Sequence, residues 1–162
     1  MGQMLPNPAR RNGKPGEGPP PRPWVVLVVD DEPDILDTFK RLLEQTLGGL
    51  TVITTTSGRE GIEILERERV DLVMSDFKMP GMDGIEFLVQ ARRIRPGVPR
   101  IMFTAFADEA LARRAITEAI VSEFLPKTAS PQDMVSHVSA LLHYEPGQPP
   151  PGGKPTMLPV GR

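Results

Sequence analysis

The chain has 162 residues, of which 39% are hydrophobic and 25% charged, a composition that suits one folded domain with a real core. It contains no cysteine, which excludes disulfide bonds, thiolate metal sites and a cysteine nucleophile. No apolar run approaches the roughly 20 residues of a membrane-spanning helix, and no apolar stretch follows the basic N-terminus as in a secretory signal. We therefore expect a cytoplasmic protein with no membrane partner.

Proline and charge divide the chain into three parts. Residues 1–23 and 145–162 together hold 13 of the 19 prolines, and such segments bury too little apolar surface to offset their ordering entropy. We predict a disordered Pro/Gly-rich tail at each of these ends and one domain at 24–144. That domain carries 13 basic and 19 acidic residues, a net charge of −6, so we expect no nucleic-acid partner.

The first half of the domain alternates between strand and helix patterns. A continuous β-branched apolar run at 24–29 predicts a strand that is buried on both faces. Apolar residues at helical spacing follow over 35–47, and a strand is predicted at 50–55. The next helix begins after Ser57, which has the spacing of a capping box with Glu60.

The second half continues the alternation. Asp83 and Ser130 are helix-capping residue types, and Pro131 suits the first helical position. The predicted elements are, in chain order, a strand at 70–75, a helix after 83, a strand at 100–103, a helix at 108–119, a strand at 123–125 and a helix after 130. Five strand–helix repeats predict a doubly wound α/β domain with a parallel sheet. Five strands favour a flavodoxin-like over a Rossmann-like arrangement.

Polar residues follow the predicted strands where each one ends. Asp30 and Asp31 follow the first strand, Asp76 the third, Thr104 the fourth, and Lys127 lies just after the fifth. Taken singly, the Asp and Thr residues are more often helix caps, and the lysine a surface residue. Ligands of an open parallel sheet, however, bind beyond the carboxyl ends of its strands. Three carboxylates there predict Mg²⁺ or Mn²⁺, and with the lysine and the hydroxyl they suit a phosphoryl group.

The sequence resembles response-regulator receiver domains over roughly residues 24–144. The likeness rests on the Asp-Asp pair, the stretch Asp-x-x-Met-Pro-x-Met-Asp-Gly from Asp76, the Thr-Ala at Thr104 and the Phe-x-x-Lys that begins at Phe124. It implies a flavodoxin-like doubly wound fold, (βα)5, with a five-stranded parallel sheet in the order 2-1-3-4-5.

The resemblance also implies an acceptor and a metal site. Asp76 would accept a phosphoryl group from a sensor histidine kinase or a phosphotransfer protein. Asp31 would bind Mg²⁺ directly and Asp30 through water. Asp76 itself and the backbone carbonyl of Lys78 would complete the ligand set.

A switch is implied as well. Lys127 would pair with the phosphoryl oxygens, and the Thr104 hydroxyl would move to hydrogen-bond one of them. Phe124 would turn inward as Thr104 moves. We expect the surface formed by helix 108–119 and the strand of Phe124 to change with it and to bind an unknown downstream protein. A homodimer that forms on phosphorylation is a further output left open.

Three residues depart from the family pattern. Phe124 stands where a tyrosine is frequent, and it has no hydroxyl. Pro126 precedes Lys127 where many receivers have a proline after the lysine, so the cis Lys-Pro bond often seen there cannot form, and trans is the default for Leu125–Pro126. Phe106 is bulky and lies two residues after Thr104, near the expected path of attacking water. We predict slow autodephosphorylation from that shielding, and no other enzymatic activity.

The sequence predicts a stand-alone response regulator, because the 18 residues from 145 onward are too few for an output domain. A phosphorelay shuttle stays open beside this hypothesis. So does an Asp-dependent phosphatase or phosphotransferase for small molecules, although Lys78 stands where such enzymes typically carry a second Asp. A flavodoxin-like binding module lacks the expected phosphate loop after the first strand.

Overall fold

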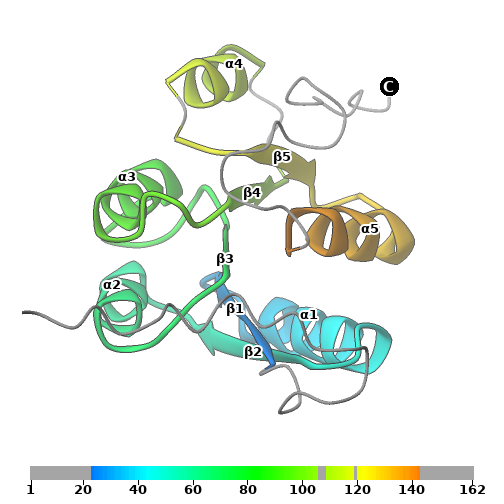
Figure 1. Ribbon diagram of the computed structural model, residues 1–162. Coiled ribbons are helices and arrows are strands. Elements are labelled where there is room, and N and C mark those ends of the chain that lie inside the picture. The colour runs from blue at the N-terminus through cyan, green and yellow to red at the C-terminus, as the bar shows by residue number, and fades with distance from the viewer. Residues whose placement is uncertain (1–22, 106–108, 119, 143–162) are drawn as a thin grey trace, which may run out of the picture.

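A computed structural model describes residues 23–105, 109–118 and 120–142 of the chain. Strands and helices alternate through these residues without interruption (Figure 1). The elements are β1 (Trp24–Val29), α1 (Pro33–Thr46), β2 (Leu50–Thr55), α2 (Gly58–Arg67), β3 (Leu72–Ser75), α3 (Gly84–Ile94), β4 (Arg100–Thr104), α4 (Glu109–Thr117), β5 (Glu123–Pro126) and α5 (Pro131–Leu142).

The five strands form one parallel sheet in the order β2-β1-β3-β4-β5. This confirms the predicted fold and strand order. Figure 1 shows α1 and α5 on one side of the sheet and α2, α3 and α4 on the other. Because all strands run the same way, their carboxyl ends meet at one edge, and the chain order reverses between β1 and β3.

Two apolar cores form, one on each face of the sheet. Val26 and Val28 pack with side chains of α1 and α5, whereas Leu27 and Val29 pack with side chains of α2 and α3. All four are fully buried, and burying one such side chain contributes about 1.5–3 kcal/mol. The unbroken apolar run of β1 is therefore the sequence of a strand with helices on both faces.

Two of the predicted helix starts are confirmed. Asp83 caps α3 by accepting from the Glu86 N–H (2.9 Å), and the Glu86 carboxylate accepts from the Asp83 N–H (3.1 Å), which completes a capping box. Ser130 caps α5, because its hydroxyl oxygen accepts from the Asp133 N–H (3.0 Å).

The capping box predicted at α2 forms only by half. Ser57 Oγ accepts from the Glu60 N–H (3.3 Å), as expected. The Glu60 carboxylate, however, accepts a short hydrogen bond from the Thr55 hydroxyl, and the Ser57 N–H donates to Thr55 Oγ1 (3.1 Å). The buried threonine at the end of β2 thus takes the place of the reciprocal bond.

Several boundaries differ from the prediction by one or two residues. The third strand begins at Leu72 rather than at residue 70, and β4 and β5 each run one residue further than predicted, to Thr104 and Pro126. The described peptide bonds are all trans, including Leu125–Pro126. Among the described residues no helix has the length and hydropathy to cross a membrane. The predicted tails lie outside the described residues except for Pro23, so they stay predictions.

Candidate functional site

The ends of β1 and β3 lie side by side at the edge where the strand order reverses. Asp30 follows β1, and its backbone N–H donates to the Thr55 carbonyl (3.2 Å). Asp76 follows β3, and its N–H donates to the Val29 carbonyl (2.9 Å). These bonds hold two carboxylates, both buried, next to each other at the carboxyl edge of the sheet.

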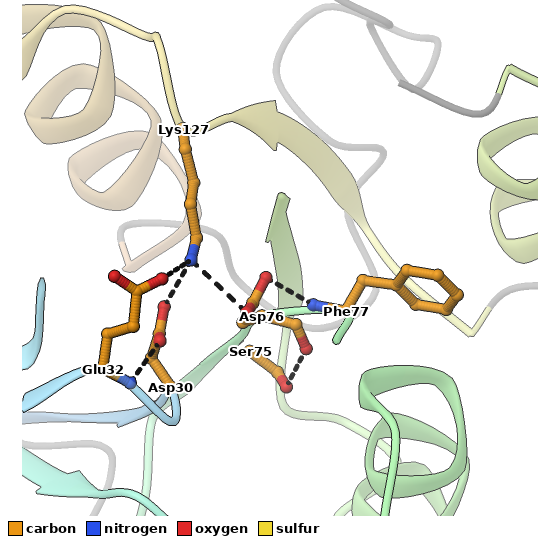
Figure 2. Close-up of polar contacts among 6 residues, drawn as sticks. All are labelled: Asp30, Glu32, Ser75, Asp76, Phe77 and Lys127. Carbon is orange, nitrogen blue, oxygen red and sulfur yellow. Dashed lines mark hydrogen bonds and ion pairs between the residues drawn. The ribbon is translucent and has the colours of Figure 1, made fainter. Parts of the chain in front are cut away.

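Lys127 reaches the same place from the far side of β4. Its backbone N–H donates to the Thr104 carbonyl (3.0 Å). Its ammonium nitrogen lies 2.9 Å from Asp30 Oδ2 and 3.3 Å from Asp76 Oδ2 (Figure 2). The same nitrogen lies 5.6 Å from the centroid of the Phe103 ring, a favourable cation–π distance. With a side chain only 15% exposed, Lys127 is a fixed charge rather than a solvated one.

The loop after Asp76 is fixed by its backbone. Asp76 Oδ1 accepts from the Phe77 N–H (2.8 Å), and the Ser75 hydroxyl donates to the Asp76 carbonyl (2.9 Å). The Gly84 N–H donates to the Phe77 carbonyl (2.8 Å). A Cβ atom at Gly84 would lie 2.0 Å from the Asp76 carbonyl oxygen, so the close approach of α3 to this loop requires glycine.

Burial and ion pairing shift the pKa values of the charged groups in opposite directions. Burial raises the pKa of Asp30 and of Asp76, although backbone hydrogen bonds and the ammonium of Lys127 oppose it. Burial alone would lower the pKa of Lys127, but its pairing with both carboxylates outweighs this and raises that pKa. One ammonium therefore does not fully compensate two buried carboxylates.

The donor set fits a hard divalent cation. Carboxylate oxygens of Asp30, Asp31 and Glu32 lie within 4.8 Å of one another. The buried Asp30 Oδ2 has no hydrogen-bond partner among the described residues beyond its ion pair with Lys127. Carboxylate oxygens without His or Cys are the ligands that Mg²⁺ or Mn²⁺ prefers. That Asp76 and the backbone carbonyl of Lys78 also bind the metal stays a prediction.

The two predicted switch residues lie on neighbouring strands. Thr104 is the buried last residue of β4, and Phe124 is a half-buried residue of β5. Phe124 packs in the same core as Met102, which pairs with it across the two strands. Thr104 comes two residues after Met102 and thus has the same face of the sheet. Phe106 lies outside the described residues.

The sequence reasoning missed Glu32. Its Oε1 atom lies 3.6 Å from Lys127 Nζ, and its backbone N–H donates to Asp30 Oδ1 (2.8 Å) (Figure 2). The signal was present, because Glu32 directly follows the Asp-Asp pair in the sequence. Its distance from Lys127, 95 residues further along the chain, could be known only from the fold.

Similarity to known proteins identifies the family of the chain. The chain matches the response regulator receiver domain family over residues 26–139. It is 39% identical over 106 residues to the transcriptional regulatory protein GlrR of Escherichia coli (strain K12), which covers 65% of this chain and 23% of that protein. It is 35% identical to an uncharacterized 14.6 kDa protein of Leptolyngbya boryana, covering 68% of this chain and 83% of that protein. GlrR and the DNA-binding transcriptional regulator NtrC are matched over only about a quarter of their length.

Solved structures agree in fold. A CheY-like response regulator receiver domain protein from Methanospirillum hungatei JF-1 aligns with a TM-score of 0.69 at 31% identity, over 74% of this chain and 94% of that chain. A receiver domain protein from Clostridium thermocellum aligns with a TM-score of 0.66 at 32% identity, over 74% and 94% of the two chains. Fold, site and family match lead to one conclusion: the chain belongs to the response-regulator receiver domains of two-component signalling.

Proposed function

We propose that the chain is a phosphorylation switch in which Asp76 accepts a phosphoryl group from a sensor histidine kinase or a phosphotransfer protein. The observation that carries this proposal is the position of Lys127, whose ammonium lies between the buried carboxylates of Asp30 and Asp76. A charge held in this way is already in place for the phosphoryl oxygens, so little reorganisation is needed when they arrive.

The transfer is a simple displacement at phosphorus. A carboxylate oxygen of Asp76 forms the new O–P bond, and the P–N bond of the phosphohistidine breaks with its electron pair left on the imidazole nitrogen. The product is a mixed anhydride with more negative charge than the carboxylate that it replaces. Lys127 then pairs with the phosphoryl oxygens instead of with bare carboxylates.

Mg²⁺ belongs to this proposal as a cofactor. Asp30, Asp31 and Asp76, with the carbonyl of Lys78, would hold it, and when bound it would neutralise charge between the carboxylates and the incoming phosphoryl group. The remaining chemistry comes from side chains of the protein itself. Asp76 is itself buried, and the Phe77 N–H donates to its carboxylate oxygen Oδ1.

The phosphoryl group on Asp76 would change the positions of Thr104 and Phe124. The Thr104 hydroxyl would hydrogen-bond a phosphoryl oxygen, and Phe124 would move into the space left beside β4. These movements would change the surface formed by α4 and β5. A partner that binds this surface would therefore bind either the phosphorylated or the unphosphorylated state better. Action in the cytoplasm on a downstream protein belongs to this proposal, as does slow autodephosphorylation.

The test is labelling of the purified chain with acetyl phosphate and Mg²⁺. We expect an acid-labile gain of one phosphoryl group in the intact protein, measured by mass spectrometry, and its loss in Asp76→Asn. Asp34→Asn, an exposed acid in the first turn of α1, is the matched control and should be labelled like the wild type. Absence of labelling in the wild type would overturn the switch.

Two further assays decide between the switch and its alternatives. Steady turnover of small phosphate esters would favour an Asp-dependent phosphatase or phosphotransferase. Transfer of the label from Asp76 onward to a histidine of a second protein would favour a phosphorelay shuttle.

A further inference from the structure

Glu32 occupies the N-cap position of α1 without acting as a side-chain cap. Its backbone is extended, as at most N-caps, yet its side chain makes no cap hydrogen bond. Pro33 takes the first helical position, where a missing N–H costs nothing. Figure 2 shows the Glu32 carboxylate beside the ammonium of Lys127 instead. The glutamate at this position is thus explained by its contact with Lys127 and not by helix capping.

Three carboxylates share the Lys127 ammonium, and they differ in how firmly they are held. Asp30 and Asp76 are 2.9 and 3.3 Å away, their side chains are 0% and 8% exposed, and each accepts a backbone N–H. Glu32 is 3.6 Å away, and its side chain is 64% exposed. Of the three, Glu32 is the one that can move with the ammonium or release it without breaking a backbone hydrogen bond of its carboxylate.

We propose that Glu32 is a positioning residue that competes with the phosphoryl group for Lys127. The proposal depends on the phosphorylation of Asp76 proposed above. Before transfer, Glu32 helps to hold the ammonium beside Asp30 and Asp76. As the O–P bond to Asp76 forms and the bond between phosphorus and the leaving group of the donor breaks, Lys127 must leave Glu32 for the phosphoryl oxygens.

The charge of Glu32 also affects cation binding, in the direction opposite to its effect on phosphoryl transfer. Its carboxylate oxygen lies within 4.8 Å of oxygens of Asp30 and Asp31, so its charge favours a cation beside them. The same charge repels an incoming phosphoryl donor, which is itself an anion. Glu32 therefore strengthens cation binding and slows phosphoryl transfer. Removal of its charge should weaken the first and speed the second, so the two effects can be measured separately.

The experiment compares Glu32→Gln, Glu32→Asp and the charge-matched control Asp34→Asn in the full chain. Mg²⁺ affinity is measured by calorimetry without a phosphoryl donor. The rate of labelling by acetyl phosphate is measured at saturating Mg²⁺; there the acetyl carboxylate leaves as acetate when Asp76 takes the phosphoryl group. In the metal-free protein, NMR of the Lys127 side chain reports its ion pairs directly.

For Glu32→Gln we expect weaker Mg²⁺ binding and faster labelling at saturation, each by about 1.5-fold to 5-fold, the range of a partly exposed ion pair. The Lys127 signal should shift in Glu32→Gln and stay in place in Asp34→Asn. Glu32→Asp keeps the charge but is one methylene shorter, so it should keep most of the Mg²⁺ affinity. Because the shorter side chain loses the contact with Lys127, it should still label faster than the wild type, though less so than Glu32→Gln.

Two results would overturn the proposal. One is a Glu32→Gln protein that matches Asp34→Asn in both affinity and rate, and the other is slower labelling at saturating Mg²⁺. A wild type that takes no label at all would instead overturn the switch itself, so the two failures are distinct.

Discussion

At the scale of single residues, the backbone around Asp76 is as important as the side chains. The stretch from Asp76 to Gly84 returns on itself, so that the first residue of α3 lies against the residue that we propose as the acceptor. Gly81, whose backbone has the left-handed conformation with φ of +82°, contributes to this turn. The glycine that ends the Asp-x-x-Met-Pro-x-Met-Asp-Gly stretch is therefore a packing requirement of the site.

Gly84→Ala should damage the site from within the loop. The new Cβ would lie 2.0 Å from the Asp76 carbonyl oxygen and 2.9 Å from Phe77 Cα. Relief requires movement of backbone, so we expect a loss of about 1–3 kcal/mol or more in unfolding free energy, measured with urea. Labelling of Asp76 should fall with it. Gly97→Ala is the control, because no atom beyond its adjoining residues lies within 4 Å of its new Cβ. An equal loss there would show that the close contact at Gly84 is not the cause.

At the scale of elements, α1 protects the free edge of the sheet. β2 is an edge strand, and Val52 carries backbone groups that face α1. The Val52 N–H donates to Glu44 Oε1 (2.8 Å), the Lys40 ammonium donates to the Val52 carbonyl (2.7 Å), and the two side chains pair with each other at 2.8 Å. Exposed edges invite pairing with other chains, and here two side chains occupy the place of a further strand.

Glu44→Ala should destabilise the protein and open this edge. The Val52 N–H would lose its acceptor, and a typical hydrogen bond contributes about 0.5–1.5 kcal/mol to the unfolding free energy. We also expect more self-association by light scattering. Asp37→Ala, an exposed acid on the same helix, should be neutral on both counts, and equal behaviour of the two variants would refute a role for the edge.

The pH dependence of this edge has a definite sign. The hydrogen bond from Lys40, followed by that from the Val52 N–H, lowers the pKa of Glu44. A carboxyl group with a lowered folded pKa adds stability above its unfolded pKa and loses it as the pH falls through the folded value. The difference between Glu44→Ala and wild type should therefore shrink at acid pH.

At the scale of the whole molecule, the site concentrates an electrostatic cost that a cation would relieve. Burial is the main reason why the pKa values of Asp30 and Asp76 are raised. A carboxyl group with a raised folded pKa binds its proton more tightly in the native state, so its contribution to stability falls as the pH rises from its ordinary pKa through the folded value. At neutral pH the native protein is therefore under electrostatic strain at these two carboxylates.

Mg²⁺ should raise the thermal midpoint of unfolding at neutral pH. Binding at ten times the dissociation constant stabilises a protein by about 1.4 kcal/mol. The shift should decline as the pH falls and protons compete for the carboxylates. Asp31→Asn, at an exposed position, should lose most of the shift by calorimetry, whereas Asp37→Asn should retain it. An equal shift in both variants would exclude a site at Asp31.

Periodicity and caps were enough to predict the elements, because each depends on neighbours a few residues away. The two-faced apolar run of β1, the capping box at Asp83 and the Ser130–Pro131 start of α5 all express local physics. Boundaries were less accurate, since hydrogen bonds from adjacent strands decide where a strand ends. The half-formed box at Ser57 failed for the same reason, as Thr55 of the strand before it supplied a competing partner.

The buried Arg100 illustrates what local patterns miss. Its Nε donates to the Ile120 carbonyl and its Nη1 to the Val98 carbonyl, each at 2.7 Å. An arginine at the start of a strand reads as a solvated end, yet here it joins the loops before β4 and before β5. Such a role depends on carbonyl groups that the sequence places up to 20 residues away.

For this protein the sequence alone determined the alternation of strands and helices, and it marked Asp30, Asp31, Asp76, Thr104 and Lys127 as candidate site residues. Only the tertiary structure decided that the Lys127 ammonium stands between Asp30 and Asp76 and within reach of Glu32. The physical reason is range: hydrophobic period and capping act over a few residues, whereas an ion pair depends on angstrom distances that exist only once the strands have paired.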